Sequence, residues 1–327
     1  MRDQAGAAIG GPEFDGPGET AGGEPGARLY SADAGVARRP PRLLLTLLGD
    51  YWWRRTEPLP SAGIVALLGE FGVSDSAARA ALSRLTRNGL LVASKHGRRT
   101  YHRLSVRAAE VLDEGARRIF SFGRTTAPWD GTWNVVAFSV PERDRSTRHA
   151  LRERLRWLGF APLYDGLWVA PWDHGSEVAA QLTELGVETA TVFRAATVPG
   201  ARAARLPQYA WDLDDLQHRY DDFITGATRL GERIHAGAVS PVDALVARTY
   251  VMDRWRAFPA LDPELPDELL PPRWPRARAR SLFITTYDML GPLAVDRVRH
   301  VLARHAPDLA DQVTYHDSDA GLADQPT

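Results

Sequence analysis

Residues 61–104 carry the pattern that most restricts what this chain can fold into. Two short amphipathic helices are joined by a tight turn, and a β-hairpin follows directly. We expect the first helix to begin at Ser61, as its N-cap, and to end before Gly72. We expect Ser74 to cap the second helix, whose apolar residues fall on one face. These apolar residues are Ala78, Leu82 and Leu85.

The segment after the second helix has the pattern of a hairpin. "LLVAS" and "TYHRLS" have the composition of short strands, and the tip "KHGRR" contains Gly97, which permits a tight turn. A helix with an apolar stripe over "RPPRLLLTLLGDYW" precedes this region, and a longer helix from about Ser105 to Phe120 follows it. This order is that of a winged helix-turn-helix, an architecture that binds DNA: a helix, a second helix, a turn, a third helix and a two-stranded wing.

Charge is distributed unevenly along the chain. Residues 38–126 contain 16 Lys or Arg and 7 Asp or Glu, a net charge of +9, whereas the remaining residues carry −10. A basic third of this kind attracts a polyanion such as DNA to one end of the molecule. The alternative is that the many arginines reflect genome composition, because Lys95 is the only lysine of the chain.

The polar residues of the second helix and of the hairpin tip are the predicted DNA contacts. Arg79 and Ser83, with Ser76 before them, suit base edges in the major groove, whereas Arg87 and the three cations of the hairpin tip suit phosphates. Arg84 has an alternative partner, an acid inside the domain, and the helix face as a whole could simply be solvated. The hairpin tip favours the DNA-binding interpretation. The predicted set is Ser76, Arg79, Ser83, Arg84, Arg87, Lys95, Arg98 and Arg99.

Residues 127–200 alternate in the order β-α-β-β-α-β. "TWNVVAFSV" is a strand, "FAPLYDGLWVAP" a hairpin that turns at Asp165–Gly166, and "VETATVFRA" a last strand. Helices over "RDRSTRHALRERLRWLGF" and over "GSEVAAQLTELG", the latter capped by Ser176, connect the strands. This order is that of a ferredoxin-like domain, an antiparallel sheet with two helices on one face.

Residues 201–310 form a predicted helical C-terminal domain. Long amphipathic segments cover 212–235 and 241–258, and the proline-rich "DPELPDELLPPRWP" cannot be helical throughout. Two further helices are expected over "ARARSLFITTYDML" and "LAVDRVRHVLARH". The predicted fold class is therefore α+β multidomain: an N-terminal winged helix-turn-helix over 38–126, a middle ferredoxin-like domain, and this helical domain.

The ends of the chain carry little that could be buried. Residues 1–37, rich in Gly, Pro and Glu, are expected to be a disordered tail, and residues 311–327 a flexible one. No apolar run approaches the ~20 residues that a membrane span requires, and we expect neither a secretory signal nor a membrane partner. With no cysteine, the chain cannot form a disulfide or a thiolate metal site. Cytoplasmic localisation is the expectation.

With these three parts in order, the chain resembles the PaaX family of bacterial repressors, regulators of phenylacetate catabolism. The matching stretches extend over roughly residues 40–305. They are "LLLTLLGDYWWRR", "GVSDSAARAALSRLTRNGLL", "GRRTYHRLS", "LGFAPLYDGLWVAPW" and "DPELPDELLPPRWPRARARSLF". The resemblance implies a homodimeric regulator that binds a double-stranded DNA operator. It also implies release from the operator by an aryl-acyl-CoA thioester, phenylacetyl-CoA in that family.

The resemblance also bears on enzyme activity. In that family the middle part looks like the small ferredoxin-fold nuclease of CRISPR systems, which places a metal-binding Asp at the end of its first strand. This chain has Ser139 there, and Glu142 follows three residues later, past a proline. We therefore predict no catalytic residues, no metal and no cofactor other than the effector.

The effector site is predicted from aromatic and basic residues. Trp172 of the tryptophan-rich middle domain, with Trp274, offers stacking surfaces to a flat aryl or adenine ring. The segment "RWPRARAR" offers clustered arginines whose planar donors suit the phosphates of coenzyme A. An amphipathic helix facing a partner subunit would explain the same arginines. The predicted residues are Trp172, Arg273, Trp274, Arg276, Arg278 and Arg280.

A second class of function is the alternative to the repressor: a nucleic-acid-processing or RNA-binding protein that uses the ferredoxin-like domain. An RNA-binding sheet of that kind exposes paired aromatic residues on its strands. The strands "NVVAFSV" and "TATVFRA" lack this signature. The sequence therefore favours the DNA-binding repressor.

Overall fold

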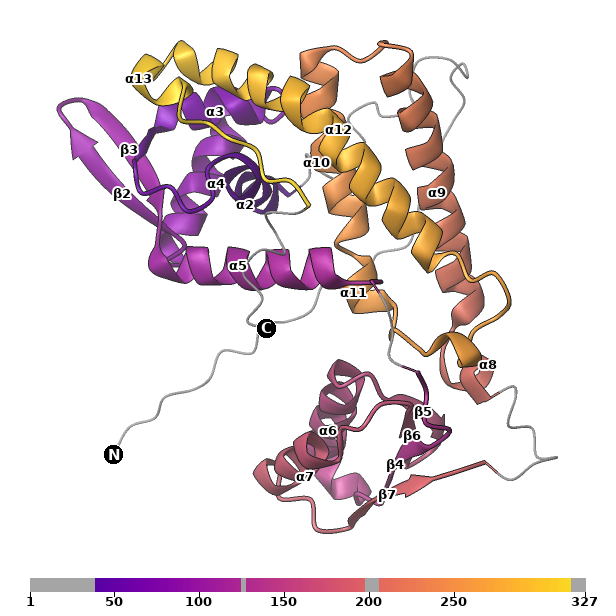
Figure 1. The fold of residues 1–327 in the computed structure, drawn as a ribbon. Coiled ribbons are helices and arrows are strands. Elements are labelled where there is room, and N and C mark those ends of the chain that lie inside the picture. Colours follow the sequence, from indigo (N-terminus) through magenta and orange to yellow (C-terminus); the bar gives the residue numbers. More distant parts are fainter. Residues whose placement is uncertain (1–38, 125–127, 198–205, 319–327) are drawn as a thin grey trace, which may run out of the picture.

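The computed structural model describes residues 39–124, 128–197 and 206–318. The chain is a mixed α+β protein with a helical C-terminal region. The first and last of these ranges pack side by side, whereas the middle range forms a smaller unit of its own (Figure 1). The predicted disordered tail over 1–37 lies outside the described residues.

The N-terminal part has the predicted order of helices and hairpin. Ser74 caps α4 by accepting a hydrogen bond from the amide of Ala77, and the turn between β2 and β3 contains Gly97 at φ 61°. These two local predictions are confirmed. The helices are α2 (Pro40–Tyr51), α3 (Ser61–Gly69), α4 (Asp75–Arg87) and α5 (Val106–Ser121). The strands are β1 (Leu59–Pro60), β2 (Leu91–His96) and β3 (Arg99–Leu104), in the order β1-β3-β2.

Ser61 is not an N-cap, contrary to the expectation from sequence. Helix α3 begins at Ser61 itself, and Pro60 occupies the cap position without a side-chain hydrogen bond. The Ser61 hydroxyl instead donates to the carbonyl of Thr100 in β3, at 2.8 Å. The reason is β1, in which Leu59 pairs opposite His102 and brings the start of α3 onto the sheet. A two-residue strand that contains a proline has no sequence pattern from which it could be predicted.

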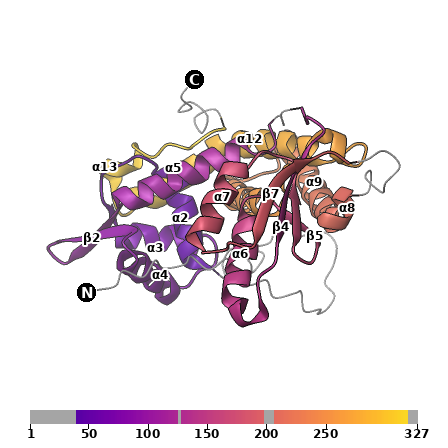
Figure 2. The ribbon, with the colours of Figure 1, turned by 90° about the horizontal axis from the view of Figure 1, so that it is seen from below.

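The middle unit consists of a four-stranded antiparallel sheet in the order β5-β6-β4-β7, with two helices on one side of it (Figures 1 and 2). The hairpin turns at Asp165–Gly166 as predicted, and Gly166 has φ 74°. Apolar residues between sheet and helices form a separate core, which includes Val136, Leu151 and Trp168. The strands are β4 (Trp133–Phe138), β5 (Ala161–Tyr164), β6 (Leu167–Ala170) and β7 (Ala190–Ala195). The helices are the 3-10 turn η1 (Glu142–Asp144), α6 (Arg145–Trp157) and α7 (Gly175–Glu184).

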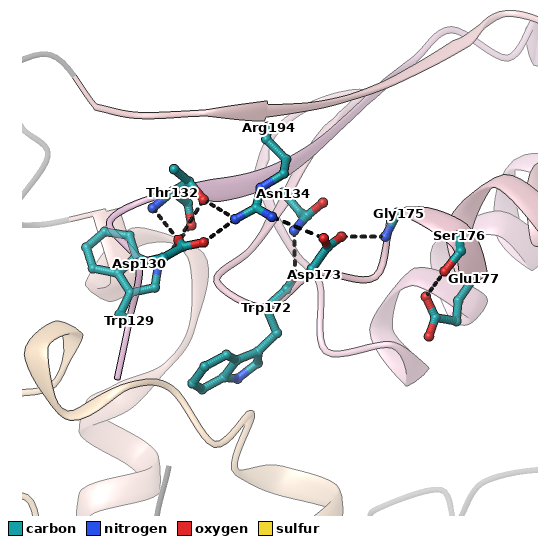
Figure 3. A network of polar contacts seen from close by, with 10 residues as sticks. All are labelled: Trp129, Asp130, Thr132, Asn134, Trp172, Asp173, Gly175, Ser176, Glu177 and Arg194. Atoms are coloured by element: carbon teal, nitrogen blue, oxygen red, sulfur yellow. Dashed lines mark hydrogen bonds and ion pairs between the residues drawn. The ribbon is translucent and has the colours of Figure 1, made fainter. Parts of the chain in front are cut away.

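The start of α7 differs from the prediction that Ser176 caps it. Ser176 is the second residue of the helix, and its hydroxyl donates to the carboxylate of Glu177 at 2.9 Å (Figure 3). The residue in the cap position, His174, makes no capping hydrogen bond with its side chain. The carboxylate of Asp173 accepts the hydrogen bond of the Gly175 amide, at 3.1 Å. Asp173 therefore takes the capping role that the sequence pattern assigned to Ser176.

The C-terminal part contains one long helix where the sequence predicted two. Helix α12 continues through Gly291 and Pro292, because both of its halves bury apolar residues, from Phe283 to Leu302, on the same core. That burial outweighs the ~3 kcal/mol cost of an interior proline. Although α12 has 28 residues, no helix in the described ranges is long and apolar enough to span a membrane. The helices are α8 (Leu206–Ala210), α9 (Leu213–His235), α10 (Pro241–Trp255), α11 (Phe258–Leu261), the 3-10 turn η3 (Asp267–Leu269), α12 (Arg276–Ala303) and α13 (Pro307–Ala310).

One apolar core runs through the N-terminal and C-terminal parts together. It includes Phe120 of α5 beside Phe283 of α12, and the ring of Phe283 stacks on that of Trp255 at 4.9 Å between centroids. At its edge, Arg297 of α12 donates two hydrogen bonds of 2.9 Å to the carboxylate of Glu70, which follows α3. The two parts are therefore held as one body, although about 80 residues of chain, including the whole middle unit, separate them in sequence.

Residues 311–318, here called the C-terminal strap, correct the predicted flexible tail over 311–327. Val313, His316 and Ser318 are buried. The amide of His316 donates to the carbonyl of Asp50 at 2.9 Å, and the hydroxyl of Ser318 donates to Asp288 at 2.6 Å. These bonds fasten the strap to α2 and α12, which the composition of the segment did not indicate. Residues 319–327 lie outside the described ranges.

Candidate nucleic-acid interface

Helix α4 presents a polar face to the outside of the molecule. Its apolar residues Ala78, Leu82 and Leu85 are buried, which fixes the helix against α2 and α3. The predicted contacts Ser76, Arg79, Ser83 and Arg87 are spaced so that they form one stripe along the opposite side, and Arg84 lies beside the stripe. All five of these side chains are exposed.

The hairpin tip carries the remaining predicted contacts. Lys95, Arg98 and Arg99 are exposed, and the β2–β3 hairpin extends away from the helices (Figure 1). Its base is fixed, because the imidazole of His102 is buried within 3.1 Å of the Ser61 hydroxyl. Burial lowers the pKa of His102, which favours the neutral ring at this position. The cations therefore sit at the free end of a rigidly anchored ribbon.

The electrostatics of this surface are one-sided. From Ser76 to Ala109 the chain contains eight Lys or Arg and no Asp or Glu, and all eight cations are exposed. Among the described residues the one ion pair they make is from Arg79 to Asp75, at 3.9 Å and open to solvent. Arg84 forms no ion pair with a described residue, so the internal partner considered for it is absent from that part of the chain. The cations are Arg79, Arg84, Arg87, Lys95, Arg98, Arg99, Arg103 and Arg107.

Two of the four predicted effector arginines make hydrogen bonds inside the molecule. The buried guanidinium of Arg276 lies 3.1 Å from the carboxylate of Asp262 and donates to the carbonyl of Leu265 at 2.9 Å. Arg280 donates to the carbonyls of Phe120 and Phe122, at 3.1 and 3.2 Å, and so joins α12 to the end of α5. Burial and nearby Arg124 lower the pKa of Arg280. Both arginines have a structural role in this state of the molecule.

The other predicted effector residues are spread around the same region. Arg273 and Arg278 are exposed, and Arg273 has a positive φ of 64°. The indole of Trp274 is half-buried against Tyr220, with 6.1 Å between ring centroids. The indole N–H of Trp172 donates to the carbonyl of Glu264 at 3.2 Å and links the middle unit to the connector before α12. Trp172 thus marks a junction between the middle unit and the C-terminal part.

Figure 3 shows how the middle unit arranges its polar residues near that junction. Arg194 of β7 donates to Asp130, to Thr132 at 2.5 Å and to Asp173 at 3.1 Å. Hydrogen bonds from Thr132, and then the charge of Arg194, lower the pKa of Asp130. The amide of Asn134 donates to the Trp172 carbonyl at 2.7 Å. One arginine thus pairs with two carboxylates, and these bonds hold the segments of the middle unit together.

The residue that follows β4, at the position where the CRISPR nucleases carry an acid, is Ser139. The backbone of Ser139 pairs with that of Thr189, and Glu142 forms an ion pair of 2.7 Å with Arg148. Within the described ranges no group of three or more His, Cys, Asp or Glu could hold a metal ion. The residues of this region therefore fit a structural role.

Sequence reasoning missed a fully buried charged residue, Arg248. Arg248 of α10 is fully buried, 3.6 Å from Asp50 of α2, and it donates to the carbonyls of Tyr287 (3.1 Å) and His316. Burial raises the pKa of Asp50, against the attraction of Arg248. Burial alone would lower the pKa of Arg248, but Tyr287, Tyr51 and Asp50 raise it above its usual value. A lone arginine in the apolar stretch "ALVARTYVM" was the one available signal.

Comparison with known proteins gives three matches to models of one family. The model described as PaaX-like protein matches residues 39–108, and the PaaX protein central Cas2-like domain matches residues 126–207. The PaaX-like protein C-terminal domain matches residues 211–300. The three matches follow the order of the N-terminal part, the middle unit and the C-terminal helices.

Two individual proteins are similar over most of the chain. The Transcriptional repressor PaaX of Escherichia coli (strain K12) is 29% identical over 261 residues, which cover 77% of this chain and 81% of that protein. Among solved structures, the Uncharacterized protein Rv0674 from Mycobacterium tuberculosis is similar with a TM-score of 0.51 and 25% identity, over 80% of this chain and 98% of that one. On the three family matches and the similarity to the repressor, the chain belongs to the PaaX family.

Proposed function

We propose that the protein is a transcriptional repressor that binds double-stranded DNA through a winged helix-turn-helix formed by α2–α5 and β1–β3. The observation that carries this proposal is the Ser76–Ala109 surface, with its eight exposed cations and no carboxylate. In this architecture α4 enters the major groove and the β2–β3 hairpin lies on the adjacent backbone. The name of the similar repressor supports the same function, and a DNA-binding regulator works in the cytoplasm.

The predicted contacts divide by their positions. Arg79 and Ser83, with Ser76, lie on the outer stripe of α4, where bidentate and hydroxyl contacts to base edges are possible. Arg87 at the end of the helix and the cations of the hairpin tip suit phosphates, which fix the register without reading sequence. Arg84, beside the stripe and without a described partner, is assigned to the phosphates as well.

Neutralising the hairpin tip tests the proposal. The triple variant Lys95→Ala, Arg98→Ala, Arg99→Ala should lose most of its affinity for the DNA upstream of its own gene, measured by fluorescence anisotropy. The matched control replaces three exposed arginines elsewhere, Arg143, Arg219 and Arg229, by alanine, so that both triple variants have the same net charge. Equal loss of affinity in both triple variants would show that overall charge, and not this surface, binds the DNA.

The proposal includes the division into a DNA-binding domain (38–126), a ferredoxin-like domain (127–200) and a helical domain (201–310) that supplies a dimer interface. A two-fold dimer suits a repeated operator, because each half-site then meets one copy of α4. Static light scattering should give twice the 36.1 kDa mass of the chain at micromolar concentration. A single-chain mass, measured both with and without DNA, would contradict the dimer.

The proposal further includes release from DNA by an aryl-acyl-CoA such as phenylacetyl-CoA. It rests on the family resemblance and on the candidate residues near the junction, of which Arg273, Arg278, Trp172 and Trp274 remain after Arg276 and Arg280 are assigned structural bonds. A ~100-fold loss of operator affinity needs about 2.7 kcal/mol of differential binding. Phenylacetyl-CoA, free CoA and phenylacetate should be titrated into the protein with and without DNA, and a response to the thioester alone supports this effector.

The face of the middle sheet opposite its helices favours the repressor over an RNA-binding protein. Trp133, Val135 and Val169 of that face are buried and pack with Trp211 and Leu269 of the C-terminal part. RNA-binding sheets of this topology keep that face open, so that bases can stack on its aromatic residues. The packing therefore supports a role for the middle unit in assembly of the protein.

A further inference from the structure

Glu264, in the connector between α11 and α12, has a backbone conformation that glutamate rarely adopts. Its φ is 51°, in the left-handed region, and Pro263 precedes it. A proline followed by a residue of positive φ is the pattern of a type II turn, in which glycine or asparagine is favoured after the proline. A residue held in such a conformation is strained, so the contacts that Glu264 makes must offset the strain.

Glu264 accepts hydrogen bonds from two other parts of the molecule. Its carboxylate accepts a hydrogen bond of 3.0 Å from the amide of Gly123, just after α5. Its carbonyl accepts a hydrogen bond of 3.2 Å from the indole N–H of Trp172 in the middle unit. These three residues are here called the clamp. The N-terminal part and the middle unit are therefore both fastened to one residue of the C-terminal part, through its side chain and through its backbone.

The connector that carries the clamp is itself anchored in the C-terminal part. The amide of Glu264 donates to the carboxylate of Asp262 at 2.7 Å. Asp262 is buried, and it also accepts hydrogen bonds from Tyr220 of α9 at 2.6 Å and from Arg276 of α12 at 3.1 Å. Arg276 in turn donates to the carbonyl of Leu265, the residue after Glu264. Buried charge-assisted bonds of this kind hold their partners in one arrangement, so the connector is a fixed base for the clamp.

The two groups that donate to Glu264 are also held in place. In the middle unit, the side-chain amide of Asn134 donates to the Trp172 carbonyl at 2.7 Å, which ties Trp172 to the first residues of β4 (Figure 3). In the N-terminal part, Gly123 has φ 69°, and an added Cβ would lie 3.3 Å from Arg276. Glycine adopts this conformation without strain and lets the chain after α5 lie close to α12. A displacement of the middle unit therefore acts on the same residue that holds the end of α5.

We propose that Glu264 is a positioning residue for DNA binding, which clamps the middle unit to the end of α5. The other end of α5 meets the base of the β2–β3 hairpin, where the hydroxyl of Ser105 donates to the carbonyl of Gly89 at 2.7 Å. The clamp thus keeps the hairpin and α4 in one orientation relative to the middle unit, so that less order has to be gained when the protein binds its operator. The effect on DNA rests on the proposed function, whereas the clamp is a property of the free protein.

The clamp is tested on the free protein by distances between two spin labels. The chain has no cysteine, so Glu110→Cys on α5 and Ser146→Cys on α6, both at exposed positions, provide the attachment sites. Double electron–electron resonance, with labelled protein diluted in unlabelled protein, should give a narrow distance distribution when Glu264 is present. Glu264→Ala should broaden it, whereas Glu264→Gln, which keeps an acceptor oxygen, should not. Glu268→Ala is the matched control, because it removes the same charge from an exposed position of the same connector. An unchanged distribution in Glu264→Ala overturns the clamp.

Substitution by glycine separates positioning from stability. Glu264→Gly loses the carboxylate but also relieves the strain of the positive φ. It should therefore melt at a higher temperature than Glu264→Ala and broaden the distance distribution equally. Both variants should bind the operator at least about fivefold more weakly than Glu268→Ala, a typical size for coupling between sites, and bind a scrambled duplex as tightly as before.

Trp172→Phe tests the other bond of the clamp, because it removes the N–H donor and keeps an aromatic ring. The two bonds act in series, so this change should weaken operator binding in the wild type and add little in Glu264→Gly. Operator affinities equal to that of Glu268→Ala in both Glu264 variants overturn the role in DNA binding. If the wild type binds operator and scrambled duplex alike, the proposed function fails, and the spin-label distances still decide whether the clamp exists.

Discussion

The hydroxyl of Tyr287 donates a 2.7 Å hydrogen bond to the carboxyl group of Asp50 and so joins α12 to α2. The guanidinium of Arg248, from α10, lies against both: 3.6 Å from Asp50, and 3.7 Å from the centre of the Tyr287 ring. It also donates to the carbonyl of His316 in the C-terminal strap. Four segments therefore converge on one arginine, whose directional bonds fix the orientation of the N-terminal part against the C-terminal helices.

Replacing this arginine should destabilise the whole body. Arg248→Met leaves the buried Asp50 without its cation and two carbonyls without a donor, and should cost about 3–5 kcal/mol in the free energy of unfolding by urea. The control is Arg219→Met, which removes an exposed helical ion pair with Asp215 and should cost less than about 1 kcal/mol. A similar small cost for both variants would show that the Arg248 cluster contributes no more than a surface pair.

The two classes of DNA contact should respond differently to substitution. Arg79→Ala should cost about 1–3 kcal/mol of operator binding and leave binding to a scrambled duplex nearly unchanged, because a base contact is lost. Arg98→Ala should weaken binding to both duplexes alike and reduce the salt slope by about 1, because a phosphate contact is lost. Anisotropy titrations on both duplexes at several salt concentrations measure this. The same profile for both variants contradicts the division.

Gly291 should resist replacement although it lies inside a helix. Alanine is about 1 kcal/mol better than glycine in a helix interior. At this position, however, an added Cβ would overlap the ring of Tyr315, and overpacking costs typically about 1–3 kcal/mol. Gly291→Ala should therefore lower the free energy of unfolding, and Gly291→Ala should become stabilising in a Tyr315→Ala background. In Gly231→Ala, with free space around the added Cβ, stability should rise in every background.

Stability should fall between pH 6.5 and pH 4 because of His316. Burial, then the charge of Arg248, lowers the pKa of His316 to about 4, against the opposing effect of Asp317. Between the ordinary value of 6.5 and that of the folded protein, the unfolded chain binds a proton that the folded protein does not. The stabilisation is therefore complete above pH 6.5 and lost as the pH falls towards 4, by about 3 kcal/mol over the full window.

The variant His316→Phe isolates this contribution. Phenylalanine keeps an aromatic ring beside Trp53 and Phe120 and does not titrate. Its unfolding free energy should therefore change less than that of the wild type between pH 6.5 and pH 4. His102, whose pKa burial also lowers, is present in both proteins, and its effect cancels in the comparison. Parallel pH profiles for the two proteins would assign the acid sensitivity to other groups.

The features predicted correctly from the sequence are those that neighbouring residues determine. The apolar spacing of α4, the Ser74 cap and the glycine turns at Gly97 and Gly166 each depend on a few consecutive residues. The predictions that Ser61 and Ser176 are N-caps were wrong. A distant strand engages Ser61, and helix α7 begins one residue before Ser176, where Asp173 accepts the hydrogen bond of the Gly175 amide.

The features that were missed are set by segments distant in sequence. An apolar helix face does not show which segment packs against it, so no local sequence pattern predicted the core that α2, α5 and α12 share. Charge did not distinguish roles either. All four arginines of the predicted effector site carry the same charge. Arg276 and Arg280 nevertheless donate to backbone carbonyls, and Arg276 also to a carboxylate, whereas Arg273 and Arg278 are exposed. The break predicted at Gly291–Pro292 failed because tertiary burial outweighed the local preference.

The shared core also sets an order of events during synthesis. The ribosome makes Asp50 237 residues before Tyr287, a delay of roughly 10–50 s at typical rates of translation. During that time the middle unit, which has its own core, can fold as soon as it emerges, while the inner faces of α2 and α5 wait for α12. The nascent N-terminal part is thus incomplete, and a chain interrupted before α12 would present apolar residues to chaperones and proteases in place of a folded N-terminal domain.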